Sequence, residues 1–213
     1  MPAKTTELEA VNTILSSVGE PPIVSLTGAQ NADATIARNI LSEISREVQS
    51  QGWHFNTFVD KTLSPDSSGE ISLATDVVRV DNDPTAQGGI SSRSTLTSPN
   101  DTRDIIQRGN KLFDKTNNTY TFSSSVRVTL VYLYNFEDLP EPARRYITVR
   151  SARVFMDRMV GSQKGHLYNA QDEMQALTIL KEFEGDTADR TIFDNNSVYK
   201  TVNRRSGIRG GGY

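Results

Sequence analysis

The side chains that could carry out chemistry in this sequence are mainly carboxylates. The clearest pairs are Asp172-Glu173 and Glu182 with Glu184, and both lie in a segment with helical periodicity. General acid–base catalysis needs two carboxylates held at a fixed separation in contrasting environments. Acidic runs on a helix are far more often a solvated face. We therefore interpret these carboxylates as solvent-facing rather than catalytic.

Other kinds of reactive site also lack support. The sequence has no cysteine, which excludes disulfides, thiolate metal sites and cysteine nucleophiles. His54 and His166 are its two histidines, and neither has a second histidine at metal-ligand spacing. No Gly-x-Ser-x-Gly elbow occurs, and Gly88-Gly89 is not followed by the Gly-Lys-Ser/Thr of a phosphate loop. The sequence thus predicts no catalytic, cofactor-binding or metal site, and no enzyme.

Trp53-His54-Phe55 is the most conspicuous aromatic cluster. It could stack a base or a sugar, but it lies where a helical pattern changes to a strand pattern. Aromatic side chains at such a junction commonly anchor two layers of structure, and they are usually largely buried. We expect Trp53 to pack in the core and His54 to be solvated.

The net charge of −3 conceals a gradient along the chain. Residues 1–60 carry three basic and seven acidic side chains, whereas all charges after Asp194 are positive. Nucleic-acid-binding domains usually show a concentrated basic face, and the body of this chain has none. The basic tail could contact an acidic partner or phosphates. The N-terminus lacks the apolar stretch of a signal peptide, and no run is long enough to span a bilayer.

Two helices are expected at the start of the chain. Thr6 and Glu9 fit a capping box, and Gly19 followed by Pro21-Pro22 stops the first helix. The second helix begins at Asn31 and ends at Gly52. Their apolar positions are Leu8, Val11, Leu15 and Val18 in the first helix, and Ile36, Ile40, Ile44 and Val48 in the second.

Strands are expected from Trp53 onwards. Gly109-Asn110 and Asn117-Asn118 are hairpin signals, and Val126 to Tyr134 is apolar on both faces, as in a central strand. The polar stretch 81–102 lacks periodicity, and we interpret it as a docking or rim loop.

Two further helices follow the strands. The first starts near Pro140-Glu-Pro142, and the second runs to about Glu184. Their apolar positions are Val149, Ala152, Met156 and Met159, then Leu167, Ala170, Met174, Leu177 and Leu180. The order predicts an α+β fold in which a bundle of about four helices (1–52 and 138–185) contains an inserted antiparallel β-module (53–137), followed by a flexible basic tail (186–213).

Several of these segments together resemble a known family. Residues 18–26 (Val-Gly-Glu-Pro-Pro-Ile-Val-Ser-Leu), 31–34 (Asn-Ala-Asp-Ala) and 48–56 (Val-Gln-Ser-Gln-Gly-Trp-His-Phe-Asn) are similar to the N-terminal signature of tail tubular protein A. This family provides the head-to-tail adaptor of short-tailed bacteriophages. Residues 108–116 resemble its hairpin and 138–146 its third-helix start. The resemblance covers roughly residues 5–185, and it is poor in 81–102 and in the tail.

The resemblance implies a structural virion protein, assembled in the cytoplasm of the host bacterium. Its members form a ring, dodecameric in this family, between the portal and the nozzle (tail tubular protein B). The helical bundle would face the portal, and the β-module would face the nozzle and tail fibres. Double-stranded DNA would pass through the lumen without sequence-specific binding, and an acidic body would discourage it from adhering. No cofactor and no membrane are implied.

Partner contacts are expected in the polar loop, at the start of the third helix and in the basic tail. The candidate residues are Gln87, Gly88, Gly89, Arg93, Arg144, Arg145, Lys200, Arg204, Arg205 and Arg209. Two alternatives remain open from the residues alone. One is a virion-associated hydrolase of peptidoglycan or glycan, which would need a carboxylate pair in a cleft. The other is a tail-fibre or capsid-binding module that forms no ring.

Overall fold

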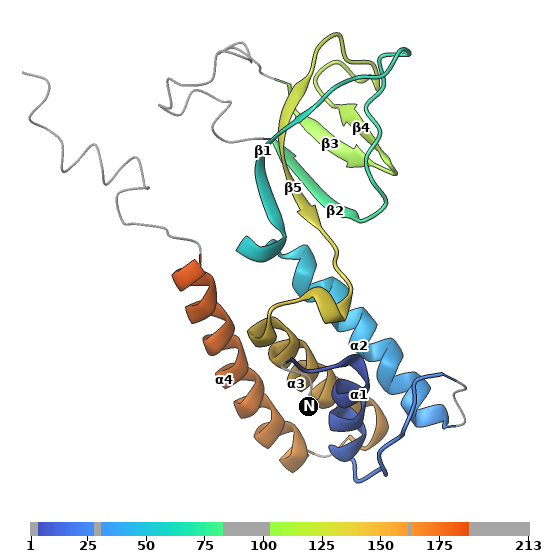
Figure 1. Ribbon diagram of the computed structural model, residues 1–213, viewed down its shortest axis with the longest axis vertical. Coiled ribbons are helices and arrows are strands. Elements are labelled where there is room, and N and C mark those ends of the chain that lie inside the picture. The colour runs from blue at the N-terminus through green and yellow to red at the C-terminus, as the bar shows by residue number, and fades with distance from the viewer. Residues whose placement is uncertain (1–3, 28–30, 83–102, 162, 188–213) are drawn as a thin grey trace, which may run out of the picture.

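The computed structural model describes residues 4–27, 31–82, 103–161 and 163–187, and Figure 1 shows helices gathered at one end and strands at the other. The predicted α+β fold is confirmed, with four helices and small antiparallel sheets. The elements are α1 (Glu7–Ser16), α2 (Ala32–Ser50), the short 3-10 helix η1 (His54–Asn56), β1 (Thr57–Leu63), β2 (Val77–Asn82), β3 (Ile105–Arg108), β4 (Lys111–Asp114), β5 (Val126–Tyr132), the 3-10 helix η2 (Phe136–Asp138), α3 (Glu141–Met159) and α4 (Gln163–Thr187).

The starts of α1 and α2 follow from local hydrogen bonding. The Thr6 hydroxyl accepts from the Glu9 N–H at 3.2 Å, and the Glu9 carboxylate accepts from the Thr6 N–H at 2.8 Å. At α2 the Asn31 side chain accepts from the Asp33 N–H at 2.9 Å. Each bond satisfies a backbone donor that the first turn of a helix leaves without a partner. The predicted capping box is therefore confirmed.

The helices form one bundle although the strands separate them in sequence. α3 packs against α1, α2 and α4, so the third helix lies at the centre of the bundle (Figure 1). The core of the bundle is continuous and contains side chains from all four helices. Almost fully buried residues in it include Val11, Leu15, Leu41, Ile147, Phe155 and Leu180. The apolar faces that predicted the helices thus bury one another.

Three apolar positions that were expected to face this core are instead exposed. Ile36 is 38% exposed, whereas Ile40 and Ile44 are buried. A residue placed every four positions advances about 40° further around an α-helix at each step, so a long row of fourth positions leaves the buried face. Met159 is exposed because it ends α3, and Met174 is 71% exposed on the side of α4 that turns away from α3.

The strands form a three-stranded sheet and a hairpin. The sheet has the order β1-β5-β2, all antiparallel, so β5 is central as its two-faced apolar pattern predicted. The hairpin joins β3 to β4 through Gly109, whose φ of 63° suits glycine, and Asn118 also has a positive φ of 52°. A second core of residues such as Ile71, Leu112, Phe122 and Val128 lies between the two sheets.

The strand pattern expected to begin at Trp53 begins later. Residues 54–56 form η1, and β1 starts at Thr57. Trp53 is buried at 8% exposure and His54 is exposed, as expected, but the 3-10 turn rather than strand alternation separates the two side chains. β1 also carries a bulge between Phe58 and Lys61, where Asp60 has a φ of 58°.

Candidate assembly surfaces and the junction between helices and strands

Two buried amides join the helical bundle to the three-stranded sheet. Gln49 is in the last turn of α2 and Asn56 ends η1, and both are fully buried. The Gln49 amide donates to the Tyr134 carbonyl at 3.0 Å and accepts from the Tyr134 N–H at 2.8 Å. The Asn56 amide donates to the carbonyl oxygens of Gln49 at 2.9 Å and Tyr132 at 2.8 Å. These bonds fix the end of β5 against the end of α2.

Trp53 and Arg79 complete this junction. The Trp53 indole donates to the Val48 carbonyl at 2.8 Å, and its backbone N–H donates to Asn56 at 2.8 Å. Arg79 of β2 donates to the carbonyls of Ser50 at 3.1 Å and Gln51 at 2.9 Å, at the end of α2 where carbonyls lack partners within the helix. Gly52 lies beneath this arginine with a φ of 81°, and a Cβ there would come within 2.9 Å of the guanidinium. We call Gln49, Trp53, Asn56 and Arg79 the junction.

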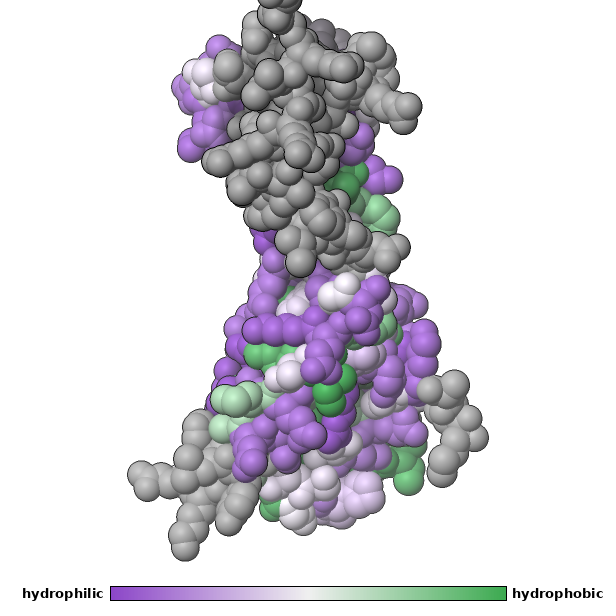
Figure 2. All heavy atoms as spheres, turned by 90° about the vertical axis from the view of Figure 1, so that its left-hand side faces the viewer, coloured by the Kyte–Doolittle hydropathy of each residue, from purple (hydrophilic) through white to green (hydrophobic). Residues whose placement is uncertain are grey.

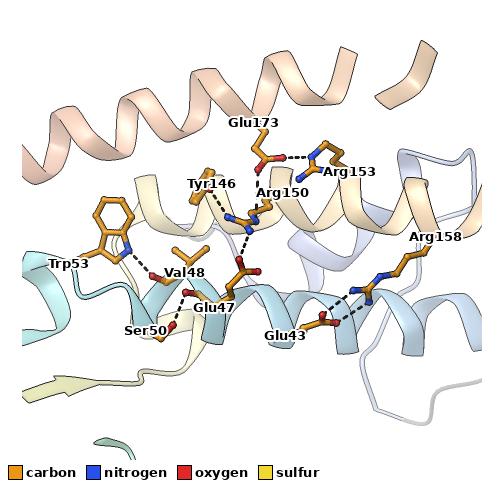
Figure 3. A network of polar contacts seen from close by, with 10 residues as sticks. All are labelled: Glu43, Glu47, Val48, Ser50, Trp53, Tyr146, Arg150, Arg153, Arg158 and Glu173. Atoms are coloured by element: carbon orange, nitrogen blue, oxygen red, sulfur yellow. Dashed lines mark hydrogen bonds and ion pairs between the residues drawn. The ribbon is translucent and has the colours of Figure 1, made fainter. Parts of the chain in front are cut away.

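Arginines of α3 tie the helices of the bundle together (Figure 3). Arg150 pairs with Glu47 of α2 and lies 3.8 Å from Glu173 of α4, and Arg153 also pairs with Glu173. Arg158 forms a two-pronged pair with Glu43 of α2, with both bonds at 2.9 Å. Arg150, Arg153 and Arg158 therefore hold α3 to its neighbours through intrachain ion pairs.

These pairs shift the acid–base properties of their members. The hydrogen bond from Arg158 holds the pKa of the Glu43 carboxyl below its usual value, and the same bond raises the pKa of Arg158. The hydrogen bond to Glu173 likewise raises the pKa of Arg153. The charged forms are favoured in each case, which is the behaviour of structural ion pairs.

Two neighbouring arginines at the start of α3 have opposite environments. Arg144 is buried at 3% exposure, and its guanidinium donates to the carbonyls of Leu139 at 2.8 Å, Thr5 at 2.6 Å and Glu137. Arg144 therefore fastens the N-terminal segment to the connection between β5 and α3. We do not propose it as a partner contact. Arg145 is exposed.

Arg145 lines a shallow groove between the N-terminal segment, α1 and α3. The groove has a volume of about 340 Å³ and is lined by Lys4, Thr5, Glu9, Thr13, Glu141, Arg145 and Thr148. We call it the α1–α3 groove. Its two carboxylates are occupied, because Glu9 caps α1 and Glu141 accepts from the Thr5 N–H at 2.9 Å. Neither Lys4 nor Arg145 forms an ion pair with a described residue, so the groove offers positive charge.

A larger groove of about 540 Å³ lies between α2 and the connection from β5 to α3. Its charged side chains include Glu7 and Arg38, which pair with each other at 2.8 Å. The hydrogen bond to Glu7 raises the pKa of Arg38. The rest of its lining is mixed, with the charged Arg46, Glu137 and Asp138 beside apolar side chains such as Leu41, Leu133 and Phe136.

Exposed apolar side chains are scattered over the described surface. Figure 2 shows the face that carries α4, where isolated hydrophobic residues stand in a mostly hydrophilic surface. The most exposed ones are Val24, Val59, Met159, Val160, Met174 and Ile179. Scattered apolar residues are normal for a protein surface, so this pattern alone does not define a binding site.

Features of other protein classes are absent from the described part of the chain. No group of three or more His, Asp or Glu side chains in residues 4–27, 31–82, 103–161 and 170–187 is arranged to hold a metal ion. No helix in these same ranges is both long and apolar enough to cross a bilayer.

Most of the predicted contact residues lie outside the described residues, namely Gln87, Gly88, Gly89 and Arg93 of the polar loop and Lys200, Arg204, Arg205 and Arg209 of the tail. The structure brings Arg145 together with Lys4, which the sequence did not indicate. The junction was missed as well. Gln49 follows Leu41 and Ser45 at intervals of four residues, so its place on the buried face of α2 was a usable signal.

Known proteins resemble this chain over most of its length. A family model described as "Tube: Tail tubular protein" matches residues 8–190. The chain is also similar to tail tubular protein A of Klebsiella phage KP34, with 25% identity over 177 residues. That alignment covers 83% of this chain and 86% of the relative.

Proposed function

The chain belongs to the Tube family of tail tubular proteins, structural components of the phage tail and hence of the virion, and on this premise we propose that it is a subunit of the head-to-tail adaptor ring. In this proposal identical subunits form a closed ring, dodecameric as the family resemblance implies. The ring joins the portal to the nozzle and gives the tail fibres a place to attach. It has no catalytic role.

The junction is the observation that carries this proposal. An adaptor must hold two partners at a fixed distance and angle, so its two ends have to be rigidly connected. Gln49 and Asn56 are fully buried and bonded to backbone atoms from both ends of the molecule. Buried and satisfied polar networks fix one arrangement, because any other leaves polar groups without partners.

The helical and stranded ends have separate roles in this proposal. The helices of 1–52 and 138–185 face the portal, and the strands of 53–137 face the nozzle and fibres. The α1–α3 groove lies at the helical end and offers the charges of Lys4 and Arg145, for which the described residues provide no ion pair. It is therefore our candidate contact for an acidic surface of the portal. The net charge of −3 suits a channel wall to which DNA should not adhere.

Assembly with the portal tests the proposal. The purified chain is mixed with the portal of the same phage and examined by negative-stain electron microscopy and native mass spectrometry. We expect one ring of this chain on each portal, with an open central channel. A chain that stays monomeric in the presence of the portal, under conditions where the portal itself is assembled, would contradict the proposal.

The groove is tested in the same assay with two charge reversals. Arg145→Glu should weaken portal binding by tenfold or more, because it places a carboxylate beside Glu9 and Glu141. Lys181→Glu on the exposed face of α4 makes the same change of charge away from the groove. Equal loss of portal binding in the two variants would show that the groove is not part of the portal interface.

A further inference from the structure

β1 lies at one end of the three-stranded sheet. Among the described strands it pairs only with β5, and Figure 1 shows it on the outer side of that strand. All seven of its residues are at least partly exposed, including Phe58 at 37% and Val59 at 64%. The backbone groups along an exposed edge can pair with a strand of another molecule. This edge is therefore a place where two copies of the chain could join.

The side chains of β1 do not by themselves prevent such pairing. Residues 57–63 read Thr-Phe-Val-Asp-Lys-Thr-Leu, rich in β-branched and apolar side chains and free of proline and glycine. Charges on an edge strand usually discourage pairing. Asp60 and Lys61 have opposite signs, however, so in an antiparallel pair of identical strands Asp60 of each copy could face Lys61 of the other. Another feature must keep the edge from pairing with itself.

The backbone of β1 departs from regular geometry at these same residues. The pairing with β5 shifts register between Phe58 and Lys61, so that Val59 and Asp60 together stand opposite one residue, Thr129. This extra residue is a β-bulge. Asp60 has a φ of 58°, a left-handed conformation that aspartate and asparagine tolerate and that β-branched residues avoid. The bulge therefore depends on the type of residue at position 60.

The bulge divides the outer edge into two short parts. Along a regular strand, the backbone N–H and C=O groups that point outward recur at every second residue. The extra residue breaks this repeat, so the outward groups of residues 57–58 and 61–63 are out of phase. A regular strand that pairs with one part cannot pair with the other, and it contacts at most three residues. That is shorter than the usual strand of about 5–6 residues.

The central strand holds the bulge in place. The Asp60 carboxylate forms an ion pair with Arg127 of β5, whose side chain is only 9% exposed. A charge with so little contact with water favours a fixed partner, because losing that partner leaves the charge uncompensated. The ion pair thus opposes a shift of the bulge along β1.

We propose that the bulge at Asp60 keeps the open edge of β1 from pairing with β1 of a second copy. The left-handed residue interrupts the edge, and Arg127 fixes the interruption where opposite charges would otherwise favour self-pairing. The free subunit thereby stays available for the contacts of the ring. This last benefit rests on the proposed function, whereas the block itself is a property of the isolated subunit.

Two substitutions of Asp60 separate the effect of the backbone from that of the charge. Asp60→Asn and Asp60→Thr both replace the carboxylate with a neutral polar group. Asparagine accepts a positive φ, whereas the branched threonine side chain disfavours it, so only Asp60→Thr should displace the bulge. In sedimentation equilibrium of the isolated subunit, we expect Asp60→Thr to dimerise more tightly than Asp60→Asn by about tenfold or more. Equal dimerisation constants would overturn the proposal.

Deletion of Asp60 removes the extra residue and brings β1 into a single register with β5. We expect this variant to dimerise as Asp60→Thr does. Amide hydrogen exchange identifies the contact, since exchange of peptide 57–63 should slow as the protein concentration rises. Dimers in which other peptides are protected and 57–63 is not would contradict the proposed role of β1.

The parent chain provides a measurement that does not depend on the folding of any variant. Exchange of its peptide 57–63 should be the same at low and high protein concentration, because the bulge blocks the edge. Slower exchange of this peptide at high concentration would show that the edge pairs in spite of the bulge, and would overturn the proposal. All of these measurements use the isolated subunit, so their result is separate from that of the portal-binding assay.

Discussion

Gln49 and Tyr134 are joined by two hydrogen bonds, in which one side-chain amide satisfies both backbone groups of a residue 85 positions away. The amide donates to the Tyr134 carbonyl and accepts from the Tyr134 N–H, as a neighbouring strand would. Gln49 thereby extends the pairing of β5 into the helical bundle. The relationship explains how a polar side chain with no exposed surface stabilises the connection between the two ends of the molecule.

Replacing Gln49 should destabilise the whole subunit. Gln49→Leu keeps the side-chain volume but leaves the N–H and C=O of Tyr134 without their partner. We expect a loss of about 3 kcal/mol in the free energy of unfolding, the order found when buried groups lose their hydrogen bonds. Chemical denaturation followed by circular dichroism measures it. Gln51→Leu, at an exposed position next to the same helix end, is the control, and equal losses would contradict the role of Gln49.

Arg144 and Arg145 should respond very differently to the same substitution. Arg144→Met removes the donor to three backbone carbonyls in a buried site, and we expect it to lower the free energy of unfolding by roughly 3 kcal/mol. Arg145→Met removes an exposed side chain that forms no ion pair with a described residue, and its effect should stay within about 0.5 kcal/mol. Thermal melting of both variants checks the difference. Similar melting temperatures would mean that Arg144 is not needed to fasten the N-terminal segment.

These two arginines show what the sequence could predict and what it could not. The capping box at Thr6 and the central strand at β5 depend on neighbouring residues and periodicity, and both were predicted. The carbonyl partners of Arg144 include Thr5, which is 139 positions away, so no local pattern separates the buried arginine from the exposed one. The spacing of Gln49 on the buried face of α2 was a local signal, but its partner Tyr134 lies 85 positions away, just after β5, so the junction itself was not predicted.

Ile40 and Ile36 test how far the periodic pattern on α2 holds. Ile40 is 2% exposed and Ile36 is 38% exposed, although the two lie one turn apart. Ile40→Asp buries an unpaired charge and should cost about 3–5 kcal/mol in the free energy of unfolding. Ile36→Asp places its charge in water and should cost less than about 1 kcal/mol. Denaturant titrations of both variants measure this contrast, and an unchanged midpoint for Ile40→Asp would place this residue outside the core.

The pair between Glu43 and Arg158 should stabilise the bundle only above mildly acidic pH. The hydrogen bond from Arg158 lowers the pKa of Glu43 in the folded chain relative to its usual value of 4.5. A carboxyl with a lowered folded pKa contributes stability above its unfolded pKa, and the contribution is lost as the pH falls through the folded pKa. Glu43→Gln should therefore lower the melting temperature slightly at pH 7 and have a smaller effect at pH 3. The pair is half exposed, so added salt should also reduce its effect at pH 7. Glu20→Gln is a suitable control, because it changes a carboxyl on the connection after α1 for which no ion pair is seen among the described residues. A melting-temperature difference for Glu43→Gln that is equal at pH 3 and pH 7 would show that this carboxylate stabilises the bundle by packing rather than by charge.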